Sequence, residues 1–160
     1  MMKKLFLLLT AIVISAAPVF LNPAVAQGVG PVTAKKGKWE LRVSKDGFSD
    51  ETRCVITYIG RSDIQVSQGS LFFDYSKKGG VESYEYRLDN EPSSGLILPD
   101  DVLRRIGIVK ISGQGFSRVM TSSRVRVQVL TLIAGLSNED VSTSGLFELY
   151  NQMLDRCGAR

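Results

Sequence analysis

The chain has 160 residues, of which 20 are basic, 16 are acidic and none is histidine. A net charge of +4 without a clustered basic face argues against nucleic-acid binding. The absence of histidine excludes the usual Ser-His and Cys-His nucleophile pairs, imidazole metal sites and the commonest general base.

The first 26 residues have the pattern of a secretory signal peptide. Lys3 and Lys4 form a positive start, residues 5–19 are an apolar run too short for a membrane span, and residues 24–26 (Ala-Val-Ala) fit signal peptidase. The alternative is an uncleaved anchor. We expect cleavage after Ala26, a periplasmic or secreted protein, and no transmembrane segment in the mature chain.

Cleavage would leave about 134 residues, which is the size of one ordinary domain with a real core. Residues 27–37 are rich in Gly, Pro and Lys and offer little to bury, so we expect a flexible N-terminus there. We expect residues 38–160 to form a single β-rich domain.

Alternating apolar and polar residues predict several short strands. The clearest case is residues 124–132, where three valines alternate with polar side chains. Loop 76–80 is expected to join its flanking strands as a hairpin, and residues 60–63 and 113–115 are expected to be turns. The expected strands are residues 39–44, 53–59, 68–75, 81–88, 108–112, 116–120 and 124–132. This set predicts a mainly β (α+β) fold, either an antiparallel β-sandwich or a curved sheet.

Two helices are expected among the strands. Residues 99–106 have acids at the start and arginines at the end, as the helix dipole prefers. A C-terminal helix should begin after residues 142–144 (Ser-Thr-Ser), which are good N-caps. Its apolar residues recur at steps of three and four from Leu146 to Cys157, so this stripe should pack on the sheet.

Cys54 and Cys157 are the two cysteines of the chain. Two thiols in an exported domain most often pair, so we expect a disulfide between them. Closing a loop of about a hundred residues would stabilise the fold by roughly 4–5 kcal/mol. The alternatives are two free thiols or a redox-active pair, although catalytic dithiols favour a C-x-x-C spacing.

Arg118, Arg124 and Arg126 are the candidate binding residues. Arg124 and Arg126 share one face of an expected strand, and Arg118 is nearby in sequence. Such a patch suits anionic lipid headgroups, lipopolysaccharide phosphates or acidic proteins. The plainer interpretation is a solvated sheet face that resists aggregation.

Aromatic residues on two expected strands give a second candidate surface. They line either a ligand groove or, as is commoner, cross-strand core pairs. Trp39, at the start of the first strand, is expected to be a core anchor. The four strand aromatics are Phe72, Phe73, Tyr84 and Tyr86.

Paired acids are the remaining candidates for catalysis. Asp46 and Asp50 flank one turn, and Asp100 and Asp101 open a helix, so a carboxylate-based hydrolase is conceivable. Turn formation and helix capping explain the same residues more simply. We therefore expect no catalytic residues, no metal site and no cofactor.

The layout from Trp39 through Asp46-Gly47-Phe48-Ser49-Asp50 to Cys54, followed by a β-rich middle and a closing helix with Cys157, resembles a known group of proteins. It is similar to small exported proteins of proteobacteria, in particular the invasion-associated locus B family and its relatives. The resemblance implies a β-sandwich-like protein of the periplasm or envelope with no known catalytic residues. It implies no binding residue.

The leading functional hypothesis is therefore a non-catalytic exported protein that binds a protein or an anionic envelope component. An inhibitor of an extracellular or host enzyme, such as lysozyme, is the first alternative. Lysozymes are commonly basic, however, and like charge between a basic enzyme and this slightly basic chain disfavours steering. The carboxylate-based hydrolase is the second alternative.

Overall fold

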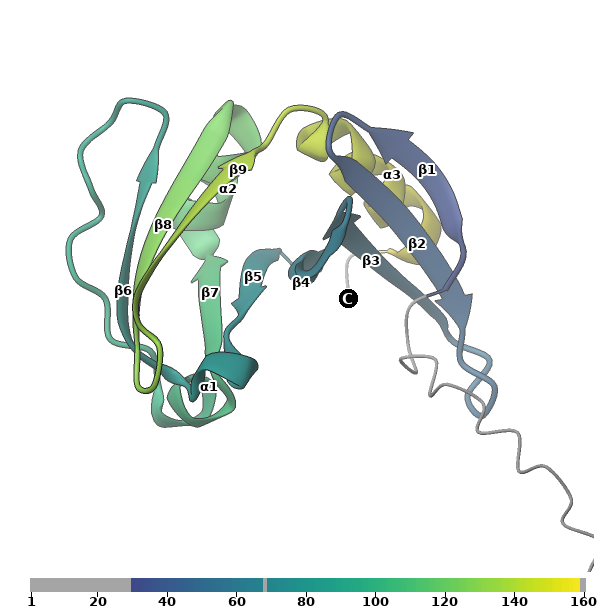
Figure 1. The fold of residues 1–160 in the computed structure, drawn as a ribbon. Helices are drawn as coiled ribbons and strands as arrows, with labels where there is room; N and C mark the ends of the chain where they lie inside the picture. The colour runs from purple at the N-terminus through teal and green to yellow at the C-terminus, as the bar shows by residue number, and fades with distance from the viewer. Residues whose placement is uncertain (1–29, 68, 159–160) are drawn as a thin grey trace, which may run out of the picture.

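The computed structural model describes residues 30–67 and 69–158 (Figure 1). The expected signal peptide, residues 1–26, lies outside the described residues. The fold is mainly β, with two antiparallel sheets and a C-terminal helix packed on the larger one, which confirms the predicted fold class.

The larger sheet has six strands in the order β1-β2-β3-β4-β5-β7. Its register aligns apolar residues from strand to strand, so that one continuous row of buried side chains crosses the sheet: Leu41, Ile56, Val66, Leu71 and Ile111. This row is the floor of the core. The strands are β1 (Val32–Lys36), β2 (Trp39–Lys45), β3 (Thr52–Tyr58), β4 (Arg61–Ser67), β5 (Ser70–Asp74) and β7 (Ile108–Ser112).

The smaller sheet has three strands, β6 (Val81–Leu88), β8 (Arg124–Thr131) and β9 (Gly135–Ser142), with β8 in the centre. The alternation predicted for β8 is confirmed, because Val125, Val127 and Val129 are buried at 1% exposure or less. Since successive strand residues point to opposite faces, the arginines and glutamine between these valines lie on the outer face.

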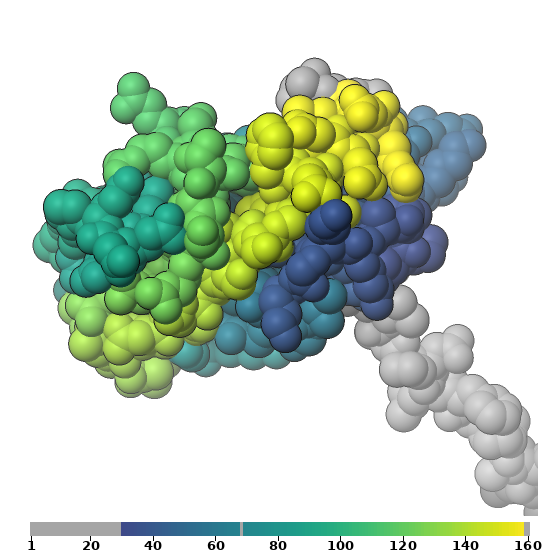
Figure 2. Space-filling model, turned by 90° about the horizontal axis from the view of Figure 1, so that it is seen from above, coloured from purple at the N-terminus to yellow at the C-terminus, as the bar shows by residue number. Residues whose placement is uncertain are grey.

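Three α-helices and one short 3-10 helix connect the strands in the described part of the chain: α1 (Asp101–Ile106), α2 (Gly113–Thr121), α3 (Leu146–Cys157) and η1 (Ser76–Lys78). The apolar stripe predicted for α3 is confirmed, since Leu146, Leu149 and Met153 are buried. Figure 2 shows α3 in yellow, beside the purple β1 and the green α2. The N-cap of α3 is Gly145, in a left-handed conformation, rather than one of the expected residues 142–144.

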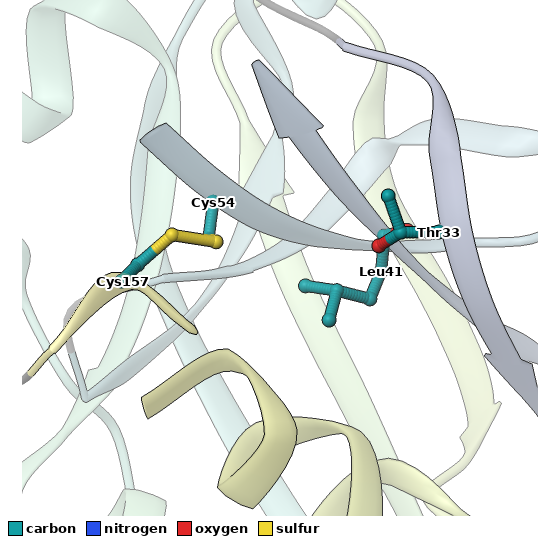
Figure 3. Close-up of a disulfide and its surroundings, with 4 residues drawn as sticks. All are labelled: Thr33, Leu41, Cys54 and Cys157. Carbon is teal, nitrogen blue, oxygen red and sulfur yellow. A yellow bond between two sulfur atoms is a disulfide. The ribbon is translucent and has the colours of Figure 1, made fainter. Parts of the chain in front are cut away.

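The predicted disulfide between Cys54 of β3 and Cys157 at the end of α3 is present (Figure 3). The two Cα atoms are 6.1 Å apart, and the bridge spans 103 residues of sequence. It links the last turn of α3 to β3, an internal strand of the six-stranded sheet. A shorter-range contact is visible nearby, where the Thr33 hydroxyl of β1 donates to the Leu41 carbonyl at 3.3 Å.

Among the described residues, three polar side-chain contacts join the two sheets, which share one core. The Trp39 indole N–H donates to the Ser142 carbonyl at 2.8 Å, and Tyr84 donates its hydroxyl to the Lys110 carbonyl at 2.8 Å. Arg61 of β4 pairs with Glu139 of β9 at 3.2 Å. Trp39 is fully buried, which confirms its role as a core anchor.

The expectation of a flexible segment over residues 27–37 is wrong for β1. Residues Val32–Lys36 form an edge strand that pairs with β2, with Lys36 opposite Trp39. Gly37 takes a positive φ of 57° and lets the chain reverse within two residues. Backbone pairing with an existing strand orders a segment whose side chains bury little.

The turn expected at residues 60–63 is present but shorter and earlier, because Ile59 and Gly60 form it and β4 already begins at Arg61. Gly60, with a φ of 79°, lets the chain reverse within these two residues. The charged pair Arg61 and Asp63 hid the alternation that continues with Ile64 and Val66, both buried.

The strand pairing expected around loop 76–80 is wrong as well. The preceding strand β5 pairs with β4 and β7, whereas β6 pairs with β8 in the other sheet. The connection through η1 is therefore a crossing between sheets, and no hairpin forms. Hairpin and crossing loops have similar turn-forming residues, so local sequence does not separate them.

Two elements of the C-terminal half were missed. The expected turn at 113–115 and strand at 116–120 are together helix α2, whose buried residues Phe116 and Val119 have helical spacing. Two glycines in its first turn lowered the apparent helix propensity. The strand β9 was not predicted because its sequence, GLSNEDVS, is polar and buries mainly Val141.

Candidate functional site

The outer face of the three-stranded sheet gathers polar side chains in two cross-strand rows. One row places Arg87, Arg126 and Asp140 next to one another across β6, β8 and β9. The adjacent row places Glu85, Gln128 and Asn138 in the same way. The hairpin β8–β9 and the sequence-distant strand β6 therefore contribute to one compact surface, which we call the arginine face.

A hollow of about 450 Å³ lies over these two rows. Its wall on the β6 side is the loop that follows this strand, since the Ser93 hydroxyl donates to Glu85 at 2.7 Å. The Ser94 backbone N–H donates to the Tyr86 carbonyl at 2.8 Å and holds the same loop along the strand edge. The lining residues are Glu85, Tyr86, Arg87, Ser93, Arg126, Val127, Gln128, Asn138, Glu139 and Asp140.

The Arg126 guanidinium is held from one side only. One terminal nitrogen donates to the Asp89 carbonyl, while Nε is buried without a hydrogen-bond partner among the described residues. Asp89 adopts a φ of 45°, and its carboxylate accepts from the Ser123 backbone N–H at 3.1 Å. The loop start is therefore fixed to β8, and it fixes the arginine in turn.

The electrostatics of the face are mixed. Arg87 is exposed and stands directly opposite Arg126, an arrangement of like charges that destabilises a sheet. Asp140 pairs with Arg124 at 3.6 Å, and Gln128 donates to Asn138 at 3.0 Å. The face offers two guanidinium groups, two carboxylates and two amides, which is a hydrogen-bonding surface with little net charge.

The structure brings together two of the three predicted arginines. Arg124 and Arg126 lie on the outer face of β8, whereas Arg118 is on α2 and forms an ion pair with Glu91 of the loop. Arg87 was missed as a site residue. Its position on a strand was expected, but nothing local to it indicates that β6 pairs with β8. The binding role of these residues stays a prediction.

The ligand groove, which was the less common of the two alternatives for the strand aromatics, does not form. Phe72 and Phe73 belong to the six-stranded sheet, and Tyr84 and Tyr86 belong to the other. Phe73 and Tyr84 are core residues, and burial raises the pKa of the Tyr84 phenol. The commoner alternative, packing within the core, describes these two residues.

The candidate acids have local structural roles. Asp46 accepts from the backbone N–H groups of Phe48 and Ser49 at 2.9 and 3.0 Å, and these hydrogen bonds hold its pKa below the ordinary value. Asp100 caps α1 by accepting from Val102 and Leu103. Asp50 pairs with Lys45. A catalytic general acid requires a raised pKa, so the shift at Asp46 is in the opposite direction.

Two further hollows lie along α3, away from the arginine face. One, of about 680 Å³, lies beside the disulfide, and the other, of about 480 Å³, lies between α2 and α3; Gly69 and Tyr150 line both. The edge of the Phe116 ring packs on Tyr150 with ring centres 5.2 Å apart. Sequence reasoning treated this stripe as core and missed the groove, although the exposed Phe147 falls outside the stripe.

Two further features concern the residues that the structure describes. These residues contain no helix that is long and apolar enough to cross a membrane, and no cluster of three or more cysteine or acidic side chains that is placed to bind a metal. Comparison of the chain with protein-family models, with curated proteins and with solved structures finds no match.

Proposed function

We propose that this protein is a non-catalytic binding protein of the periplasm or the extracellular space, and that its arginine face binds an acidic glycan of the cell envelope. The observation that carries the proposal is the pair Arg87 and Arg126, opposed across β6 and β8 on the floor of the hollow. Their proximity costs stability that an anionic group between them would recover.

The neighbouring side chains narrow the ligand class. A carboxylate or phosphate accepts hydrogen bonds from a planar guanidinium, and sugar hydroxyls pair with amide and carboxylate groups such as those of Gln128, Asn138 and Glu85. Because Glu85 lies beside the two arginines and Asp140 is already paired with Arg124, the face has only a small positive charge, and charge alone does not attract a polyanion to it. A ligand that combines sparse negative charge with many hydroxyls fits best.

The disulfide supports the expected location, because such bonds persist outside the reducing cytoplasm. The sequence resembles the invasion-associated locus B family, whose members are exported proteins without known catalytic residues. We propose this relationship together with the function.

The test uses isothermal titration with lipid-free acidic oligosaccharide from lipopolysaccharide, and sedimentation with isolated peptidoglycan. We expect Arg87→Gln to weaken binding about tenfold, which corresponds to one charged hydrogen bond of about 1.4 kcal/mol. Arg53→Gln is the matched control, since Arg53 is an exposed arginine of the six-stranded sheet that pairs with Asp46. Equal binding by Arg87→Gln and wild type would contradict the proposal, as would no binding to either probe.

A protein partner is the second candidate, and the hollows along α3 favour it. Their lining includes Phe147, Tyr150 and Met120, and Phe147 is 54% exposed beside them. Aromatic and thioether side chains at a hollow are the anchors by which proteins bind an apolar segment of another protein. The enzyme-inhibitor hypothesis is the special case in which that partner is a lysozyme. A lysis assay with wild type and Phe147→Ser tests it, and the expected result is inhibition by wild type only.

A further inference from the structure

Aliphatic side chains gather in solvent at the end of the molecule where the β8–β9 hairpin meets α1 and η1 (lower end of Figure 1). Ile133 is 82% exposed, and four others are more than half exposed. We call this surface the apolar tip. Its residues are Val102, Ile106, Leu132, Ile133 and Leu136.

Close backbone approach joins the hairpin to η1 and α1 at the tip. A Cβ atom added to Gly79 would lie 2.4 Å from Ile133, and one added to Gly80 would lie 2.9 Å from the Arg104 carbonyl and 3.4 Å from Leu132. The Ile133 backbone N–H also donates to the Lys78 carbonyl at 3.3 Å. The hairpin, η1 and the last turn of α1 therefore touch one another, and both glycines have a positive φ, which favours glycine.

Exposed cations border the tip. Arg104 and Arg105 occupy the last turn of α1, and Lys77 is exposed on η1. No carboxylate among the described residues forms an ion pair with these three side chains. The acids Asp100 and Asp101 lie at the opposite end of α1, and Asp100 is engaged as the helix cap. Three exposed acids near the tip would oppose an anionic surface: Asp74 before η1, Glu82 on β6 and Asp101 in the first turn of α1.

This combination of chemistry points to a lipid surface. Aliphatic residues on a protruding hairpin enter the boundary between headgroups and acyl chains, and flanking arginines and lysines meet the phosphates of anionic lipids. A protein interface would place aromatic anchors at its centre, and the tip has none. We propose that the apolar tip docks this protein on the surface of an anionic phospholipid membrane.

The proposal goes beyond glycan binding and gives the two surfaces a fixed relation. Arg126 and Thr131, the last residue of β8, are five residues apart, or about 17 Å at the usual rise of a strand, and Leu132 of the tip follows in the hairpin turn. A protein docked by its tip would hold the arginine face just above the membrane.

The test is flotation of the full-length mature protein with vesicles of phosphatidylcholine alone or mixed with phosphatidylglycerol. We expect binding to the mixed vesicles that falls as salt is raised. Leu132→Ser with Ile133→Ser should reduce the bound fraction at least tenfold, because two exposed aliphatic anchors are lost. Arg104→Gln with Arg105→Gln should weaken binding about fivefold per arginine and flatten the salt dependence.

Phe48→Ser is the matched control, because Phe48 is 100% exposed on the turn between β2 and β3 and lies outside the tip. It should float as wild type does. Arg87→Gln should also leave vesicle binding unchanged, and the tip variant should leave glycan binding unchanged, so the two proposals fail separately. Absence of wild-type binding, or equal binding by the tip variant, would overturn the proposal. Self-association that the tip variant abolishes, without vesicle binding, would identify the tip as an interface between copies and would also overturn it.

Discussion

The two sheets of this protein differ in how they are held. The six-stranded sheet has its apolar face covered by α2 and α3 and is fastened to α3 by a disulfide. The three-stranded sheet has no covalent link of its own, and its outer face carries the hollow of the arginine face. The covalent link and the covering helices therefore belong to the larger sheet, while the arginine face and the hairpin of the apolar tip belong to the smaller one.

Few polar contacts hold the smaller sheet in place against the larger. In the described part of the chain, these contacts include the hydrogen bond from the Trp39 indole to the Ser142 carbonyl and the ion pair between Arg61 and Glu139. Valines of β8 complete the shared core. We therefore expect the largest loss of stability from removing the disulfide, a smaller loss from removing a contact between the sheets, and a still smaller loss from removing a helix cap.

The largest effect is expected from removing the disulfide. Cys54→Ser with Cys157→Ser should lower the free energy of unfolding by about 4–5 kcal/mol, because the unfolded chain regains the freedom of a loop of 103 residues. Urea denaturation of the two proteins measures the difference. A loss below about 1 kcal/mol would show that the packing of α3 alone holds the larger sheet.

The joint between the sheets is tested by Trp39→Phe. The Ser142 carbonyl loses its buried donor, so the free energy of unfolding should fall by about 1–3 kcal/mol. Circular dichroism follows this unfolding, because Trp39 is the single tryptophan of the chain. Tyr58→Phe is the control, since it keeps the edge-on ring contact with Trp39 at 5.0 Å. Equal stabilities of Trp39→Phe and wild type would mean that the indole hydrogen bond does not join the sheets.

A smaller effect is expected at the base of the apolar tip. Asp100→Ala removes the cap that accepts two backbone N–H groups of α1, and it should cost about 1 kcal/mol. Amide hydrogen exchange of residues 101–106 should accelerate accordingly. Asp101→Ala leaves the cap intact and is the control. If both variants exchange alike, the cap does not stabilise α1.

The smallest loss of stability is expected when low pH protonates Asp63. Hydrogen bonds from Arg61 hold the pKa of Asp63 below its ordinary value of 3.8. The carboxylate therefore contributes stability at pH values above about 4, and this contribution is lost as the pH falls through the lowered pKa. Because the pair is partly exposed, the contribution should stay below about 1 kcal/mol.

Urea midpoints of wild type and Asp63→Asn, measured from neutral pH to below about pH 3, test this expectation. The two curves should converge at the acid end. A difference that persists there would mean that Asp63 acts through packing rather than through its charge.

Local sequence patterns were sufficient for several elements. The alternation in β8, the stripe of α3 and the acids at the start of α1 each reflect contacts within one element, and each was found. Pairing of the two cysteines also followed from their number and the expected compartment. These features depend on residues close in sequence or on residues with a single possible partner.

The tertiary structure decided the rest. The sequence by itself determined a mainly β domain with a closing helix, a disulfide and two arginines on one side of a strand. Only the fold placed Arg87 against Arg126, ordered β1 as an edge strand and separated β5 from β6. The physical reason is that a strand chooses its neighbour by burial and register across the whole core, and a short segment carries no record of that choice.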